Sequence, residues 1–213
     1  MTFALRVIQP PPSRDTSRAP PRSVRISVTD RCDMACVYCR PPLHDACVPG
    51  RDRLDVARWE TLVRGLMRAG VRRVRITGGE PLLFKDLPEL IARLAALGLD
   101  DLALTTNGSR LARLAGPLRA AGLRRVTVSV DSLDASRFTR VTRGGDLDAV
   151  LDGVRSAVAA GFDEVKTNTV VLRDENDHEL APITEWTWSQ GVTPRFIEVM
   201  GVGEGGRVWR SKL

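Results

Sequence analysis

The sequence lacks the features that would place the protein in a membrane or outside the cell. No apolar run approaches the roughly 18 residues that indicate a membrane-spanning helix. The first residues, Met1 to Gln9, do not contain the long apolar core of a signal peptide. Hydrophobic residues make up 43% of the 213, an ordinary share for a chain that buries a single core. We therefore expect a folded cytoplasmic protein with no membrane partner.

Aromatic residues and lysine are also scarce. Aromatics account for 5% of the chain, so there is no basic and aromatic track of the kind that holds single-stranded nucleic acid. Of the 32 cationic residues only Lys85, Lys166 and Lys212 are lysines, and arginine carries the net charge of +6. Arginine suits phosphate because its guanidinium group binds two oxygens at once, but an arginine-rich solvated surface has the same composition. We expect no nucleic acid partner, and a non-catalytic nucleic acid or zinc binding protein remains the alternative.

The cysteines are confined to one short segment, between positions 32 and 47. A disulfide framework would spread them along the chain, whereas a cluster in a reducing compartment indicates a metal site. The C-x3-C-x2-C spacing of Cys32, Cys36 and Cys39 suits three irons of a four-iron cluster and leaves the fourth iron open. Zinc is the alternative, because His44 and Cys47 could complete a four-ligand site. The residues alone leave both metals open.

A short sequence motif recurs along the rest of the chain and marks boundaries between predicted helices and strands. Ala-Gly-Val-Arg-Arg-Val at 69–74 returns as Ala-Gly-Leu-Arg-Arg-Val at 121–126, with weaker echoes at 160–162 and 190–192. Glycine adopts the left-handed conformation that ends helices, so each copy of the motif predicts a helix end followed by a strand. Before this pattern, residues 1–22 are rich in proline and arginine, and we expect a flexible segment there. The folded domain is predicted to span 23–213.

Helices and strands are predicted to alternate. Apolar residues recur at helical spacing and are expected to face the core, namely Trp59, Leu62, Val63, Leu66 and Met67, then Leu87, Leu90, Ile91 and Leu94, then Leu147, Val150, Leu151, Val154 and Val158. Six strands are expected at 24–28, 74–77, 102–106, 126–130, 165–171 and 195–199. A complete eight-unit barrel takes about 250 residues. The pattern therefore predicts an α/β fold with parallel strands, a partial (βα)6 TIM-type barrel.

Polar residues lie within or just beyond five of these strands. They are Thr77-Gly78-Gly79-Glu80, Thr105-Thr106-Asn107-Gly108, Ser129-Val130-Asp131, Lys166 with Asn168, and Glu198 to Met200. The carboxyl ends of parallel strands open on one mouth, where ligands bind in this class of fold. We expect these residues and the cysteine loop to share one cavity.

The segment 25–39, Arg-Ile-Ser-Val-Thr-Asp-Arg-Cys-Asp-Met-Ala-Cys-Val-Tyr-Cys, resembles the signature of the radical S-adenosylmethionine superfamily, and 77–82 resembles its second motif. The resemblance implies a [4Fe-4S] cluster on the three cysteines and reductive cleavage of S-adenosylmethionine to a 5'-deoxyadenosyl radical. It also implies residues that contact S-adenosylmethionine: Gly78, Gly79 and Glu80 at the amino group, Ser129 at the carboxylate, and Tyr38 and Met200 beside the adenosine.

Within that superfamily the chain is most similar to the GTP 3',8-cyclases that begin molybdenum cofactor biosynthesis, from about Val24 to Trp209. The resemblance implies a lyase with GTP as substrate, a flavodoxin or ferredoxin type electron donor, and nucleotide contacts from Arg25, Arg75, Thr105, Lys166, Asn168 and Arg195. Several cations at one mouth are costly to desolvate unless an anion such as a triphosphate neutralises them. The alternative is that individual cations pair with acids such as Asp131 or Glu198.

The sequence departs from this family in one respect. Its members continue further and carry three more cysteines for a second cluster that binds the purine, whereas here no cysteine follows Cys47. A truncated cyclase, a fragment completed by a second copy or another chain, and a related enzyme acting on a peptide or natural product all fit this departure. The final Ser211-Lys212-Leu213 matches a peroxisomal address, and we expect that match to be chance.

Overall fold

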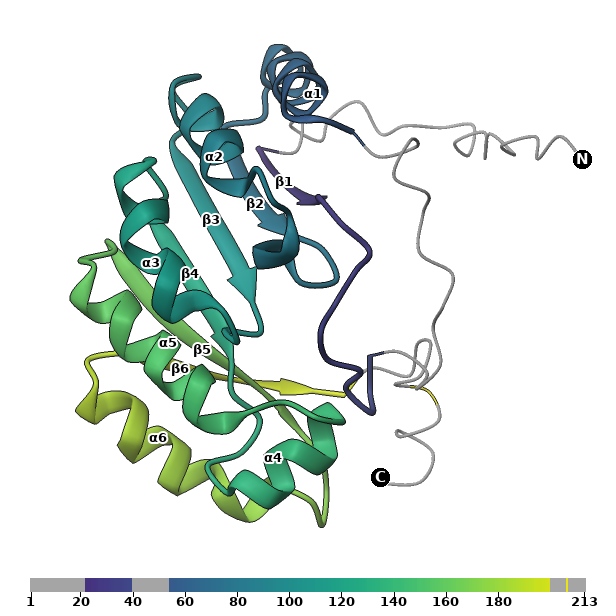
Figure 1. The fold of residues 1–213 in the computed structure, drawn as a ribbon, viewed down its shortest axis with the longest axis vertical. Coiled ribbons are helices and arrows are strands. Elements are labelled where there is room, and N and C mark those ends of the chain that lie inside the picture. Colours follow the sequence, from purple (N-terminus) through teal and green to yellow (C-terminus); the bar gives the residue numbers. More distant parts are fainter. Residues whose placement is uncertain (1–21, 40–53, 200–205, 207–213) are drawn as a thin grey trace, which may run out of the picture.

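Six parallel strands form one curved sheet in the order of the sequence (Figure 1). The computed structural model describes residues 22–39, 54–199 and 206. Within these ranges β1 and β6 do not pair with each other, so the barrel is open. The strands are β1 (Ser23–Ser27), β2 (Arg73–Thr77), β3 (Asp101–Thr106), β4 (Arg125–Ser129), β5 (Glu164–Val171) and β6 (Thr193–Glu198). The predicted partial (βα)6 barrel is confirmed, and each predicted strand lies within two residues of an observed one.

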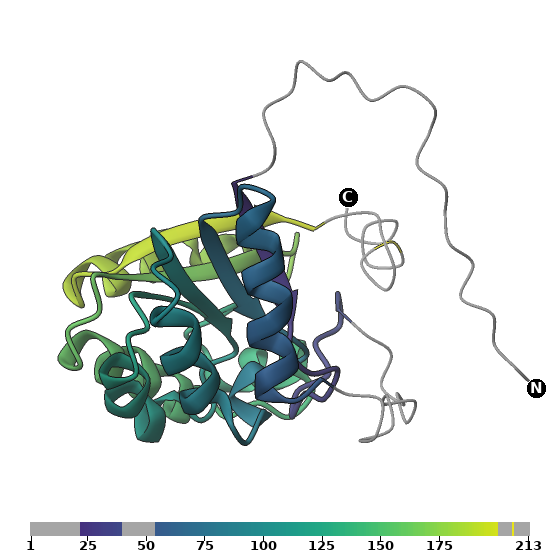
Figure 2. The same cartoon turned by 90° about the horizontal axis from the view of Figure 1, so that it is seen from above.

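Helices cover one face of this sheet, and Figure 2 shows the two layers from above. The helices are α1 (Val56–Arg68), α2 (Leu87–Ala95), α3 (Leu111–Ala120), α4 (Ala135–Thr142), α5 (Leu147–Ala159) and α6 (Leu180–Ser189), with short 3-10 turns η2 (Pro81–Leu83) and η3 (Asp177–Glu179). None of them is long and apolar enough to cross a membrane.

The repeated glycines end helices as predicted. Gly70 and Gly122 both have φ of 100°, and Gly161 and Gly191 have φ of 71° and 70°. These left-handed values strain any residue with a Cβ. At Gly122 space is also limited, because a Cβ would lie 2.7 Å from the Cβ of Ala95. Each glycine thus turns the chain from the helical layer back into the sheet.

The core lies between the sheet and the helices. Leu90, Leu94, Val150 and Val154 are fully buried there, as their helical spacing predicted. The prediction was wrong for Leu62 and Val158, whose exposed fractions are 42% and 40%. Val158 is in the last turn of α5, and Leu62 is on α1, whose packing partner among the helices is α2. Positions at the border of an apolar stripe stay in solvent where no further element covers them.

Strand residues alternate between this core and the opposite face. In β2, Val74 and Ile76 are buried, while Arg75 and Thr77 are half-buried on the other side. The same period of two holds in β5, where Val165 and Thr167 are buried and half-buried residues separate them. The half-buried polar residues, such as Arg75 and Thr77, therefore face the inside of the barrel, where the candidate site lies, while Thr167 lies on the core side.

Several sequence predictions fall outside the described residues. Residues 1–21, His44, Cys47, Met200 and the last three residues belong to this group. The boundary between a flexible segment and a domain at 22/23 stays a prediction.

Candidate functional site

A cavity of ≈ 840 Å³ occupies the inner face of the barrel and receives residues from all six strands. Twelve of the residues that the resemblance assigns to the cluster, S-adenosylmethionine or the nucleotide line it: Arg25, Cys32, Cys36, Tyr38, Cys39, Arg75, Gly78, Gly79, Thr105, Ser129, Asn168 and Arg195. Glu80 and Lys166 are not among the lining residues. The fold thus brings most of the predicted site together.

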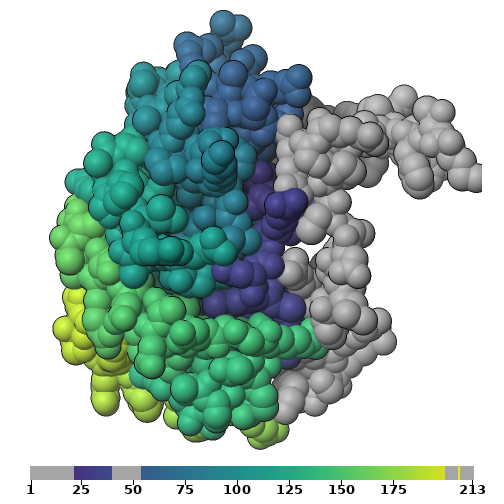
Figure 3. Space-filling view, viewed as in Figure 1, coloured from purple at the N-terminus to yellow at the C-terminus, as the bar shows by residue number. Residues whose placement is uncertain are grey.

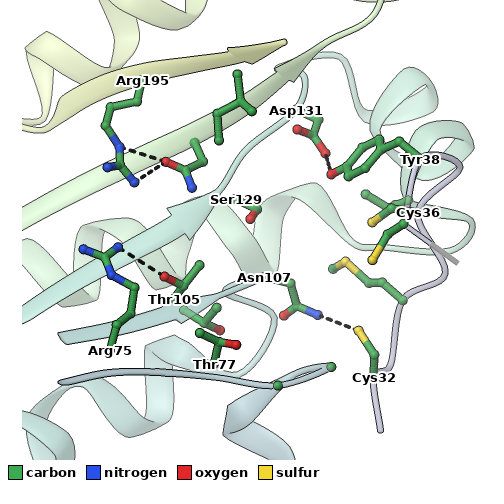
Figure 4. A pocket seen from close by; sticks show the side chains of 18 of the residues that line it. Cys32, Cys36, Tyr38, Arg75, Thr77, Thr105, Asn107, Ser129, Asp131 and Arg195 are labelled. Atoms are coloured by element: carbon green, nitrogen blue, oxygen red, sulfur yellow. Dashed lines mark hydrogen bonds between the residues drawn. The ribbon is translucent and has the colours of Figure 1, made fainter. Parts of the chain in front are cut away.

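The cavity has two chemically different ends (Figure 4). Cys32, Cys36 and Tyr38 lie at one end, which we call the sulfur end. Arg75 and Arg195 lie at the other, which we call the cation end. Ser129, Thr105, Thr77 and Asn107 lie between the two ends and present hydroxyl and amide groups. One molecule in the cavity could therefore contact sulfur-bound metal while a second, anionic one occupies the cation end.

Residues 28–39, the cysteine loop, are held against the carboxyl end of β2. The Gly79 N–H donates to the Thr29 carbonyl at 2.6 Å, and the Glu80 N–H donates to the Arg31 carbonyl at 2.6 Å. A Cβ at Gly79 would lie 2.2 Å from the Arg31 carbonyl oxygen, and one at Gly78 would lie 2.6 Å from the Thr29 carbonyl oxygen. The two glycines are needed because the loop backbone passes this closely, in addition to their place in the cavity wall.

The same loop is bonded to the end of α4. Ala35 N–H donates to the Thr142 carbonyl at 3.0 Å, and Val37 N–H donates to the Val141 carbonyl at 2.9 Å. These carbonyls belong to the last turn of the helix, where intrahelical donors run out. In the space-filling view the loop, in purple, lies directly against the green surface of α4 (Figure 3). The cysteines are thus positioned from two sides of the barrel mouth.

Asp131 provides a third attachment, which the sequence reasoning did not assign. Its carboxylate accepts the Tyr38 hydroxyl at 2.5 Å and the Val170 N–H at 2.9 Å. The Asn176 amide donates to the Asp131 carbonyl at 2.7 Å and to the Val170 carbonyl at 2.9 Å. Burial raises the pKa of Asp131 to about 6, although both hydrogen bonds to its carboxylate oppose the rise. Burial, followed by the charge of Asp131, also raises the pKa of the Tyr38 phenol.

Glu80 lies behind the cavity wall. It is fully buried, and its carboxylate accepts the Thr106 hydroxyl at 2.6 Å, the Asn107 N–H at 2.6 Å and the Leu82 N–H at 2.9 Å. Burial raises its pKa to about 7 despite these three donors. A carboxylate with these bonds joins the end of β3 to the loop after β2. The expected contact of Glu80 with a bound amino group therefore stays a prediction.

The cation end contains arginines without acidic partners. Within the part of the chain that the structure describes, no carboxylate forms an ion pair with Arg25, Arg75 or Arg195. Arg195 donates twice to the Asn168 amide oxygen, at 3.0 and 2.7 Å, and Arg75 donates to the Thr105 hydroxyl at 3.4 Å. Burial and the nearby arginines lower the pKa of Arg75. Arg75 and Arg195 are half-buried and Arg25 is exposed, and uncompensated positive charge of this kind at one cavity favours an anionic ligand.

Lys166 is placed differently from these arginines. Its ammonium group pairs with the Glu164 carboxylate at 2.9 Å, and its side chain is 24% exposed. The alternative that a predicted nucleotide contact pairs with an acid therefore applies to Lys166, although the acid is Glu164 and neither Asp131 nor Glu198. The sequence did not indicate this partner, because the strand was predicted to begin at 165, one residue after Glu164.

The three thiols have the donor chemistry of an iron-sulfur site. All three line the cavity, but residues 22–39, 54–199 and 206 contain no group of three His, Cys, Asp or Glu side chains close enough to hold one metal ion. A four-iron cluster does not require such convergence, because each thiolate binds a different iron. Burial and then Asp131 raise the pKa of the Cys36 thiol to about 12, so a bound cation is needed to keep it as thiolate. The residues fit a cluster better than a single zinc ion.

Comparison with known proteins identifies the family. The pattern that defines the Radical SAM superfamily matches residues 26–187. The chain belongs to the radical SAM superfamily. Its members use a [4Fe-4S] cluster and S-adenosylmethionine, which agrees with the predicted cofactors.

Radical SAM proteins with similar sequences come from several bacteria. The chain is 47% identical over 197 residues to the GTP 3',8-cyclase of Xanthomonas campestris pv. campestris (strain B100), which covers 90% of this chain and 58% of that protein. It is 46% identical over 206 residues to the GTP 3',8-cyclase of Acidothermus cellulolyticus, covering 94% and 57% respectively. The predicted resemblance to this family is confirmed, and the chain spans less than two thirds of the length of these relatives.

Solved structures share the fold at low sequence identity. The SuiB structure from Streptococcus suis bound to the precursor peptide SuiA superposes with a TM-score of 0.71 at 18% identity, over 85% of this chain and 40% of that one. Coproporphyrinogen III oxidase (HemN) from Escherichia coli gives 0.61 at 16% identity, over 92% and 49%. At these identities the comparison establishes the architecture alone.

Proposed function

We propose that the chain binds a [4Fe-4S] cluster through Cys32, Cys36 and Cys39 and cleaves S-adenosylmethionine reductively at the sulfur end of the cavity. One observation carries the proposal: a three-thiol loop and a group of uncompensated arginines face the same cavity. When bound and reduced, the cluster supplies the electron that this cleavage requires. The electron comes from a one-electron donor of the flavodoxin or ferredoxin type.

At the sulfur end the chain orients S-adenosylmethionine. From its position between the two ends, Ser129 offers a hydroxyl to the carboxylate, and the backbone of Gly78 and Gly79 borders the amino group. Tyr38 lies beside the adenosine and is fixed there by its bond to Asp131. Glu80 supports this wall through its three hydrogen bonds. Met200 is proposed as a further adenosine contact on the strength of the resemblance.

At the cation end we propose a nucleoside triphosphate, GTP. Arg25, Arg75 and Arg195 supply charge that a triphosphate would neutralise, and Thr105 and Asn168 orient two of those arginines. The similar proteins are GTP 3',8-cyclases, which supports the choice of nucleotide. Conversion to cyclic 3',8-dihydroguanosine triphosphate, the first step toward molybdopterin, is the reaction we propose. No cysteine follows Cys47 in this sequence, so the purine contacts are not assigned to cysteines here.

The experiment is anaerobic reconstitution with iron and sulfide, followed by incubation with S-adenosylmethionine and dithionite. We expect about four irons per chain and formation of 5'-deoxyadenosine. A fully loaded protein that forms no 5'-deoxyadenosine with any reductant would refute the cleavage reaction. One zinc and no iron after anaerobic purification would favour the non-catalytic alternative. GTP is tested separately by calorimetry, and no binding at millimolar concentration would refute the substrate assignment.

A further inference from the structure

Asn107 points its side-chain amide at a cysteine of the proposed cluster site. It follows β3 directly, and its Nδ2 lies 3.9 Å from the Cys32 Sγ (Figure 4). The same Nδ2 donates to the Asp33 carboxylate at 2.7 Å. An amide nitrogen carries two hydrogens, so Asp33 takes one and the other remains for the sulfur.

The orientation of this amide is fixed by its other contacts. Its Oδ1 accepts the Ser109 N–H at 3.0 Å, and its backbone N–H donates to the buried Glu80 carboxylate at 2.6 Å. Asp33 in turn accepts the Ser109 hydroxyl at 2.8 Å and lies 3.6 Å from the Arg110 guanidinium. Turning the amide over would place its oxygen against the Asp33 carboxylate, which is repulsive. The nitrogen therefore faces the sulfur.

We propose that Asn107 is a positioning residue that donates an N–H to the Cys32 thiolate and thereby raises the reduction potential of the cluster. The inference rests on the proposed cluster site. Reduction adds negative charge that is shared by the ligating sulfurs, and an N–H aimed at a sulfur stabilises that charge. Asn107 thus makes the cluster easier to reduce by the external donor.

The test compares Asn107→Ala with Ser109→Ala in the reconstituted holoprotein. Ser109→Ala removes a hydrogen bond to Asp33 but leaves the amide that faces the sulfur, so it is the matched control. At a fixed poise we expect the ratio of reduced to oxidised cluster to fall about tenfold in Asn107→Ala, equivalent to about 59 mV for one electron. EPR-monitored redox titration measures this ratio. An unchanged potential in Asn107→Ala, or an equal shift in the control, overturns the inference.

A second measurement uses the wild-type protein, so it applies even if Asn107→Ala fails to bind iron. In wild-type protein labelled with [15N]asparagine, pulsed EPR of the reduced cluster should detect a nitrogen coupling and a nearby proton that exchanges in D2O. Absence of both overturns the inference while leaving the proposed function intact. A wild-type chain that takes up no iron overturns the proposed function, and the inference falls with it.

Discussion

The amino ends of the strands and the cavity inside the barrel both contain arginine, but only the amino ends supply acids to neutralise it. Arg125 pairs with Asp101 and, at 3.2 Å, with Glu164. Arg124 pairs with Asp163 at 2.8 Å. In the described part of the cavity, Arg75 and Arg195 have neutral partners, Thr105 and Asn168. The difference indicates that arginine charge at the amino ends is neutralised by acids of the fold, whereas arginine charge in the cavity is available to bind an anion.

The carboxylates of the two regions also differ in their protonation. Hydrogen bonds with Arg124 and Lys166 lower the pKa of Asp163 and Glu164 at the amino ends. Burial raises the pKa of Glu80 and Asp131 around the cavity. Exposed ion pairs contribute little to stability, but a buried carboxylate is costly when ionised. Ionised carboxylates around the cavity therefore cost stability, whereas those at the amino ends are favoured by their cationic partners without adding much stability.

The largest effect is expected from removing a thiol. Cys36→Ala should reduce reconstituted iron from about four per chain to background, because two thiolates cannot hold the cluster. The thermal unfolding of the metal-free protein should change little, since Cys36 is only partly buried. Iron analysis and circular dichroism measure the two outcomes. Cys47→Ala is the control and should retain iron. Full iron in Cys36→Ala would exclude this residue as a ligand.

Next in size is a steric change at the mouth. Gly79→Ala should destabilise the protein by about 2–4 kcal/mol, because its Cβ would collide with the backbone carbonyl of Arg31. Gly65→Ala within α1 is the matched control: nothing lies within 4 Å of its Cβ, and alanine should stabilise the helix by about 0.5–1 kcal/mol. Urea denaturation measures both. Equal effects of the two substitutions would contradict the close packing of the cysteine loop.

Smaller losses are expected from single cations. Arg75→Ala and Arg195→Ala should each weaken GTP binding roughly 10- to 100-fold, the equivalent of one charge-assisted hydrogen bond to phosphate. Arg124→Ala at the amino ends should leave affinity unchanged. The loss of GTP affinity in Lys166→Ala should be smaller than in Arg75→Ala and larger than in Arg124→Ala, because Glu164 already neutralises this cation. Titration calorimetry supplies the affinities, and a loss at Arg124 equal to that at Arg75 would abolish the distinction between the two regions.

The last prediction concerns pH dependence, and the pKa shift sets only an upper limit on its size. The pKa of Glu80 is raised in the folded state to about 7 from 4.5, so the folded state binds more protons, and stability should fall as pH rises from about 4.5 to 7. Glu80→Gln should remove the share of this decline that Glu80 contributes, at most on the order of 3 kcal/mol, and leave the share that Asp131 contributes below about pH 6. Asp163 has a lowered pKa and the opposite sign: its stabilisation is present above about 4 and is lost in acid. Asp163→Asn should therefore leave the decline between 4.5 and 7 in place, which denaturation at several pH values would reveal.

The cysteine loop and the glycine motif could be recognised from sequence because their function depends on neighbours in the chain. Cys32, Cys36 and Cys39 share one loop, and Gly78 and Gly79 follow one strand, so local spacing brings each set together. The partners of Glu80 and Asp131 were missed for the opposite reason. Glu80 bonds to the end of β3, and Asp131 bonds to Tyr38, which is 93 positions earlier. Local sequence patterns do not predict hydrogen bonds between residues so far apart in the chain.

The sequence by itself determined the alternation of helices and strands, the glycines that end helices and the thiol spacing, because these follow from backbone preference and a period of two or 3.6 residues. The tertiary structure decided which charges remain uncompensated. Lys166 and Arg195 both face the inside of the barrel, yet one meets Glu164 and the other Asn168. Strand register and sheet curvature fix those distances, and neither is encoded in the residues of a single strand.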